Sequence, residues 1–154
     1  MFAIYAYTED VSWTNIYHYD KDARTLNYET SPQIKDLVQD WYNPPIGWAE
    51  QTGVVAGIGD GLFDPTANVT REEFAQMMYH YAEYKGYDLT ARGDLSRYPD
   101  SGTVAGWAQT AMEWAYGNQL INGHDDGTLE PGGTTTRAQA ASILMRFDQN
   151  VVEN

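Results

Sequence analysis

Two arginines occupy equivalent positions in the chain, each directly after a threonine, in the dipeptides Thr70-Arg71 and Thr136-Arg137. Each dipeptide begins a Thr-x-x-Glu or Thr-x-x-Gln pattern, which predicts that the threonine caps a helix and that the arginine lies in its first turn. The helix dipole disfavours a cation there by about 0.3–1 kcal/mol. A guanidinium beside unpaired helix-start amides binds a carboxylate, so the pattern predicts carboxylate clamps at Arg71 and Arg137.

A structural salt bridge is the alternative role for these arginines. Carboxylates precede each dipeptide, namely Asp60 and Asp64 in the first case and Asp126 and Glu130 in the second. An ion pair of this kind orients a guanidinium without any ligand. Both roles are compatible, because a loop acid can orient an arginine that also contacts a ligand carboxylate.

Tryptophans are the second group of candidates, because an aromatic face packs on the apolar face of a sugar ring. Trp48 and Trp114 are each followed by an alanine on an apolar stripe, which favours packing in the core. Trp41 and Trp107 stand at predicted helix starts and are the better candidates for a sugar-binding groove.

Two glycine-rich loops, at residues 57–65 and 123–131, provide the third group. Their glycines suit turns, and the missing side chain also allows a sugar to approach the backbone. The loop candidates for ligand binding are Gly57, Gly61, Gly123, Gly127, Asp60 and Asp126. The loop acids also raise the possibility of calcium, but neither loop has the EF-hand ligand set, and turn chemistry is the alternative.

Other chemistry is poorly represented. The chain has no cysteine, so disulfides, thiolate zinc sites and cysteine nucleophiles are excluded. The three histidines share no repeated spacing, and no serine lies in a Gly-x-Ser-x-Gly elbow. Pairs of acids are weak support for a glycosidase in a chain with 22 carboxylates. The sequence therefore predicts no enzyme, no catalytic residue, no metal site and no cofactor.

The net charge of the chain restricts the classes of partner that it can bind. The 154 residues carry 9 Lys+Arg against 22 Asp+Glu, a formal net charge of −13, which opposes binding to nucleic acid or to an anionic membrane. No apolar run reaches the ~18 residues of a membrane span. Residues 1–10 lack the basic and apolar regions of a signal peptide, so we expect either an internal protein or a mature fragment.

The positions that could carry chemistry recur because the chain repeats itself. A shift of 66 residues superposes two segments without a gap from residue 41 to residue 81. The superposed pairs include Trp41 on Trp107, Trp48-Ala49 on Trp114-Ala115, Gly57 on Gly123, Asp60-Gly61 on Asp126-Gly127, and Thr70-Arg71 on Thr136-Arg137. Repetition of this kind predicts tandem copies of one supersecondary unit.

Each unit is predicted to be helix, loop, helix. In the second unit an apolar stripe at helical spacing runs from Trp107 to Ala115, whereas Pro44-Pro45 restricts the first helix of the first unit to about residues 46–51. The second helices begin after the threonine caps and end near Lys85-Gly86 and at Phe147.

The predicted organisation has five parts. Residues 1–34 form a β-rich segment, with a hairpin from two alternating, aromatic-rich runs, Asn15–Tyr19 and Thr25–Tyr28, and a third strand at 2–7. Residues 35–85 are the first repeat, 86–97 a linker, 98–149 the second repeat and 150–154 a tail.

Together these motifs resemble the S-layer homology family, whose repeats anchor bacterial surface proteins to cell-wall polysaccharide. The second unit follows the family order through Tyr98-Pro99-Asp100, Trp107-Ala108, Leu120-Ile121-Asn122-Gly123, Asp126-Gly127-Thr128-Leu129-Glu130-Pro131 and Thr136-Arg137-Ala138-Gln139. The first unit matches through Trp48-Ala49, Gly53–Gly57, Asp60-Gly61, Phe63-Asp64-Pro65 and Val69–Phe74.

The resemblance implies a non-catalytic, secreted module at the cell surface that binds pyruvylated secondary wall polysaccharide through the arginines of its Thr-Arg motifs. It also implies a mainly α fold, in which three repeats form a spindle with grooves between neighbours. This chain has two repeats, and Gln139 replaces the usual glutamate. The third position is then absent, filled by residues 1–34, or supplied by a neighbouring domain or a second copy. An assembly scaffold that binds no glycan is the alternative function.

Overall fold

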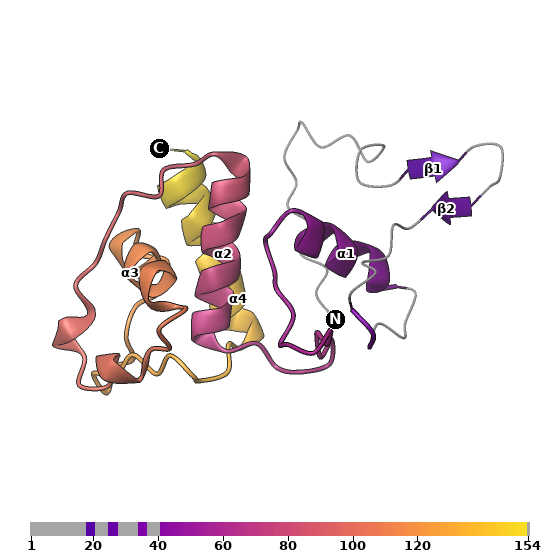
Figure 1. The fold of residues 1–154 in the computed structure, drawn as a ribbon. Coiled ribbons are helices and arrows are strands. Elements are labelled where there is room, and N and C mark those ends of the chain that lie inside the picture. The colour runs from indigo at the N-terminus through magenta and orange to yellow at the C-terminus, as the bar shows by residue number, and fades with distance from the viewer. Residues whose placement is uncertain (1–17, 21–24, 28–33, 37–40, 154) are drawn as a thin grey trace.

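The structure is a computed structural model, and it describes residues 18–20, 25–27, 34–36 and 41–153. Helices are the main secondary structure of this part of the chain (Figure 1), which confirms the prediction of a mainly helical fold. The α-helices are α1 (Asn43–Gln51), α2 (Arg71–Lys85), α3 (Gln109–Gly117) and α4 (Arg137–Phe147). Short helical turns form η1 (Leu95–Arg97), η2 (Ser101–Thr103) and η3 (Asp148–Val152).

Two short strands precede the helices. Strand β1 (His18–Asp20) pairs antiparallel with β2 (Thr25–Asn27), with His18 opposite Asn27 and Asp20 opposite Thr25. The chain that links the two strands, residues 21–24, and the third strand predicted at residues 2–7 lie outside the described residues.

The predicted capping boxes form at both second helices. Thr70 Oγ1 accepts the Glu73 amide at 3.2 Å, and the Glu73 carboxylate accepts the Thr70 amide at 2.7 Å. Thr136 and Gln139 exchange the same two bonds, so glutamine replaces glutamate without loss of the box. The predicted helix ends are confirmed as well: α2 stops before a left-handed Gly86, and α4 stops at Phe147.

Two details of the first helices differ from prediction. Helix α1 begins at Asn43 and includes Pro44-Pro45, rather than starting at residue 46. Proline is tolerated in the first helical turn, because the amide that it lacks has no partner within the helix there. Trp107 was predicted on the apolar stripe, but α3 begins only at Gln109, and Trp107 precedes it.

One hydrophobic core joins α2, α3 and α4. The Trp114 side chain is completely buried at its centre, packs edge-on against Tyr79 of α2, and donates from Nε1 to the Asp88 carbonyl at 3.2 Å. Tyr81 and Phe147 connect α2 to α4, with ring centroids 5.9 Å apart. The second helix of the first repeat therefore packs on the second repeat and shares its core.

Helix α1 lies on the other side of α2 and contacts it through Trp48. In Figure 1 it stands beside α2, away from α3, and the Trp48 ring meets Tyr84 edge-on at 5.9 Å. The segment between the repeats also packs closely. Leu95 is buried, and the Gly93 amide donates to the Glu113 carbonyl at 2.8 Å. This packing fixes the position of the second repeat relative to α2.

The opposite environments of the tryptophans predict different effects on stability. Trp114→Ala should lower the free energy of unfolding by about 3–5 kcal/mol, because it empties the centre of the core. Trp107→Ala is the matched control and should change it by less than about 1 kcal/mol, since this ring is 56% exposed. Urea titrations followed by circular dichroism measure both values, and equal losses would contradict the assignment of the core.

Candidate functional site

Arg71 lies at the junction of the two repeats. It is the first residue of α2, yet its side chain is 4% exposed and reaches into the loop of the second repeat. Its Nε donates to the Leu129 carbonyl at 3.0 Å, and its Nη2 donates to the Asn122 carbonyl at 2.7 Å. The guanidinium therefore binds carbonyl oxygens, which differs from the carboxylate salt bridge considered from the sequence.

The amides at the start of α2 are also occupied. The Arg71 amide donates to the Gly133 carbonyl and the Glu72 amide to the Pro131 carbonyl, each at 2.9 Å. The prediction that unpaired amides here would bind an anion together with the guanidinium is therefore wrong for α2. The reason is tertiary, because the loop of the second repeat supplies the acceptors that an anion would otherwise provide.

Electrostatics around Arg71 combine burial with acidic neighbours. Burial lowers the pKa of Arg71, while the potentials of Glu130, Tyr98 and Asp100 act to raise it. An arginine remains protonated at neutral pH in such a site. The junction is thus a buried cation held by carbonyl dipoles and by nearby acidic groups.

Asp100 organises the loop that receives Arg71. Its carboxylate accepts the Leu129 amide at 2.9 Å and the Glu130 amide at 2.7 Å. These two hydrogen bonds lower the pKa of Asp100, since they stabilise the ionised carboxylate. The same carboxylate thereby places the Leu129 carbonyl where Arg71 binds it.

Asp36 has the same role in the first repeat. It accepts the Phe63 amide at 3.0 Å and the Asp64 amide at 2.7 Å. Partial burial acts to raise the pKa of Asp36, but the amide hydrogen bonds outweigh it, and the net shift is downward. The two repeats therefore fold their loops around equivalent carboxylates.

The repeat found in the sequence did not identify Asp36 as the counterpart of Asp100 in the first repeat. Asp36 stands five residues before Trp41, whereas Asp100 stands seven residues before Trp107. A two-residue difference therefore separates these carboxylates from the ungapped superposition. A comparison that allowed this gap would have aligned them.

The loop glycines have a clear structural reason. A Cβ on Gly57 would stand 2.6 Å from the Leu62 carbonyl oxygen, and one on Gly123 would stand 2.8 Å from that of Thr128. Left-handed φ angles of 73° and 83° occur at the other predicted pair, Gly61 and Gly127. Turn geometry thus accounts for these four glycines, and a contact with ligand would be an additional role.

The loop acids also serve the turns. Asp126 Oδ1 accepts the amide and the hydroxyl of Thr128, at 3.0 and 2.7 Å. Asp60 has a φ of 53°, and its carbonyl accepts from the Lys35 ammonium at 3.0 Å. Within the described residues, no group of three or more His, Asp or Glu side chains is placed to hold a metal ion.

The tryptophans divide as the sequence indicated. Trp41 is 60% exposed and Trp107 56% exposed, so both present an aromatic face to solvent next to a helix start. Trp114 is buried, and Trp48 is half-buried against Tyr84. The exposed pair occupies equivalent positions in the two repeats.

Arg137 contrasts with Arg71. It is exposed at the first residue of α4, although it corresponds to Arg71 in the repeat. The sequence predicted two equivalent clamps, but the structure distinguishes a buried arginine at the junction from an exposed one on the surface.

A family model for the S-layer homology domain matches residues 33–75 and 97–141, which is more than half of the chain. The chain belongs to the S-layer homology family. Similar proteins include an endoglucanase of Bacillus sp. (strain KSM-635), 33% identical over 79% of this chain. The surface-layer 125 kDa protein of Lysinibacillus sphaericus is 30% identical over 84%, and a cellulosome-anchoring protein of Acetivibrio thermocellus is 30% identical over 66%.

The chain spans only a small part of these relatives, namely 13%, 11% and 22% of their lengths. Membership in the S-layer homology family indicates a module that attaches proteins to the cell wall, outside the cell. None of the helices in the described residues is long and apolar enough to cross a membrane.

The contrast between the two arginines predicts unequal effects on folding. Arg71→Ala should lower the free energy of unfolding by about 2–4 kcal/mol, because it removes charge-assisted hydrogen bonds to two carbonyls at the junction. Arg137→Ala, the matched control in the second repeat, should change it by less than about 1 kcal/mol. Urea unfolding measures both, and a larger loss for Arg137→Ala would reverse the assignment.

The lowered pKa of Asp100 predicts a pH dependence. An aspartate of the unfolded chain titrates near pH ~3.9. Asp100 therefore contributes stability above about that pH, and this contribution is lost as the pH falls through the lower pKa of the folded state. Asp100→Asn should be less stable at neutral pH and lose less of its stability on acidification. The exposed Asp125→Asn variant is the control, and identical pH profiles for all three proteins would contradict the role of Asp100.

Proposed function

We propose that this chain is a non-catalytic anchoring module that binds an acidic, pyruvylated secondary wall polysaccharide. The family and its surface-layer relatives support attachment to the wall. The observation that carries the choice of ligand is an exposed guanidinium at the start of a capped helix, Arg137 of α4. A planar guanidinium makes two parallel hydrogen bonds to a carboxylate, and pyruvate ketals present one.

Arg71 has a different role from Arg137 in the proposed binding site. Its Nε and Nη2 are engaged by carbonyls and the residue is buried, so its proposed role is to shape the binding site from the junction. Its main contribution is to hold the loop of the second repeat against α2. Trp41 and Trp107 provide exposed aromatic faces for sugar rings, and the loops around Gly57, Gly61, Gly123 and Gly127, with Asp60 and Asp126, provide backbone close to the polymer.

Completion of a three-part spindle is a further element of the proposal. The described chain forms one junction between two repeats, built around Arg71. A third position, supplied by residues 1–34, a neighbouring domain or a second copy, would create further junctions. Light scattering after gel filtration gives the mass in solution, and a monomer that still binds glycan would exclude obligatory assembly of copies.

Calorimetry with pyruvylated wall polysaccharide tests the ligand. Arg137→Ala should weaken binding about tenfold or more, equivalent to roughly 1.4 kcal/mol, because one charge-assisted pair is lost. Arg92→Ala is the matched control, since Arg92 is also an exposed arginine but lies in the segment between the repeats, away from the start of α4. The same polysaccharide with its pyruvate removed should bind weakly to every variant. Unchanged affinity in the Arg71→Lys, Arg137→Ala double variant would refute the clamps.

Ionic strength is a second readout of the same complex. With a net charge of −13, the protein repels an anionic polymer at long range, so binding depends on local positive charge. Added salt screens that repulsion. Affinity should therefore fall less than for a basic protein, or rise, and a steep loss with salt would contradict the proposal.

A further inference from the structure

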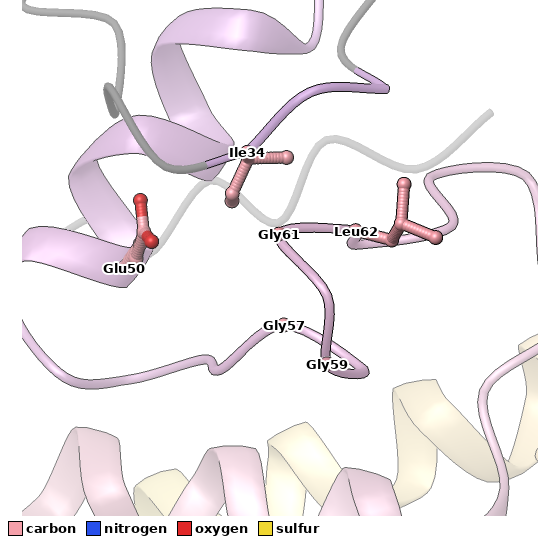
Figure 2. A pocket seen from close by; sticks show the side chains of 6 residues that line it. All are labelled: Ile34, Glu50, Gly57, Gly59, Gly61 and Leu62. Atoms are coloured by element: carbon pink, nitrogen blue, oxygen red, sulfur yellow. The ribbon is translucent and has the colours of Figure 1, made fainter.

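The loop of the first repeat borders a cavity. The cavity has a volume of about 190 Å³ and is lined by Ile34, Glu50, Gly57, Gly59, Gly61 and Leu62. In Figure 2, the Glu50 side chain extends from α1, and the glycines lie on the loop. This volume is below the ~300–1,000 Å³ typical of sites for drug-sized ligands, so it suits a single small ring with its substituents.

The two loops share their closing hydrogen bond but differ at their tips, where Gly59 and Asp60 have left-handed φ angles of 107° and 53° and the corresponding Asp125 and Asp126 do not. The Ile58 amide donates to the Leu62 carbonyl at 2.8 Å, and the His124 amide donates to the Thr128 carbonyl at the same distance. Asp36 and Asp100 anchor the loops in the same way. The space beside each loop therefore depends on the loop tip as well as on the side chains that line it.

Two tyrosines occupy the equivalent space in the second repeat. The alignment of Asp36 with Asp100 places Ile34 opposite Tyr98, and the 66-residue repeat places Glu50 opposite Tyr116. Tyr98 and Tyr116 pack edge-on with ring centroids 5.6 Å apart. The Tyr98 ring covers Gly123, and its hydroxyl accepts the Gly123 amide at 3.0 Å.

The first repeat has Ile34 and Glu50 where the second has these tyrosines, and two polar groups there have no partner among the described residues. Among the described residues, Glu50 Oε2 is buried with no hydrogen-bond partner, and none accepts the Gly57 amide that corresponds to the Gly123 amide. Gly57 is exposed, so its amide is open to a ligand that accepts from it in place of the tyrosine hydroxyl. Ile34 and Leu62 supply apolar surface beside these polar groups.

We infer that this cavity is a subsite for one neutral pyranose unit. A sugar hydroxyl can accept from the Gly57 amide, as the Tyr98 hydroxyl does from Gly123, and another can donate to Glu50. The C–H face of the ring packs on Ile34 and Leu62, in place of the tyrosine ring. The inference rests on the proposed function for the origin of the sugar, a wall polymer.

Charge selects against an acidic sugar in this subsite. Glu50 lines the cavity, and the carboxylates of Asp36 and Asp64 lie on the same loop system. A pyruvylated unit would be repelled here, whereas Arg137 attracts one. The polymer is therefore read at two places with opposite preferences, acidic units at the arginine and neutral units at the cavity.

Amide NMR with a neutral monosaccharide tests the subsite directly. Titration of the ¹⁵N-labelled protein with N-acetylglucosamine or glucose should shift the amide signals of Gly57, Gly59 and Gly61. The amides of Gly123 and Gly127 are internal controls and should not move. Pyruvate, the matched anion, should leave the Gly57 signal in place. Absence of any shift at Gly57 with either sugar at high millimolar concentration would overturn the inference.

Two variants separate binding from folding. Ile34→Tyr introduces the residue that the second repeat carries at this place, and should abolish the Gly57 shift by filling the cavity. Glu50→Leu keeps a similar volume but removes the acceptor, and should weaken the shift at least severalfold. Should Ile34→Tyr not fold, the Glu50→Leu result decides. Sugar-induced shifts that are unchanged in a folded Ile34→Tyr variant, or in Glu50→Leu, would contradict the subsite.

Binding of the wall polysaccharide is measured separately from the monosaccharide titration. If the protein fails to bind wall polysaccharide, the proposed function fails, while the monosaccharide titration still tests the cavity. If it binds, Glu50→Leu should reduce affinity for the polymer without changing its dependence on pyruvate, which Arg137 governs. Equal polymer affinity in the wild type and Glu50→Leu would overturn a role for the cavity in anchoring.

Discussion

The contact between the Arg71 guanidinium and the carbonyls of the second loop is the interaction on which the tandem arrangement depends. Removing a charged group from water is costly unless it is hydrogen-bonded, and here Leu129 and Asn122 supply acceptors. The same loop caps the start of α2 through Pro131 and Gly133. Helix α2 therefore belongs to the first repeat by sequence but to the second repeat by packing.

Several carboxylates of this acidic chain stabilise its loops. Asp36 and Asp100 each accept two loop amides, and Asp126 closes a turn with Thr128. These carboxylates are satisfied by backbone donors rather than by arginine or lysine, which allows a folded protein with a net charge of −13. An acidic ligand must consequently find a local site of positive charge, and a neutral ligand is not opposed in this way.

Equivalent positions in the two repeats differ in their side chains or in their surroundings. Arg71 is buried at a junction, whereas Arg137 is exposed. Tyr98 fills the space above its glycine loop, whereas Ile34 leaves the corresponding space open. Two copies of one unit thus offer different surfaces.

Local signals in the sequence determined the helix caps at Thr70 and Thr136, the helix ends, the burial of Trp114 and the membership of the family, because each depends on neighbouring residues or on the repeat. The sequence could not distinguish Arg71 from Arg137, since their motifs are alike and only the position of the next loop buries one of them. Only the tertiary structure decided that the amides of α2 are occupied, that Asp36 and Asp100 accept the loop amides, and that a cavity opens beside Gly57. Each of these depends on segments brought together across some 20 to 60 residues, where the spacing of side chains along the chain no longer indicates which groups meet.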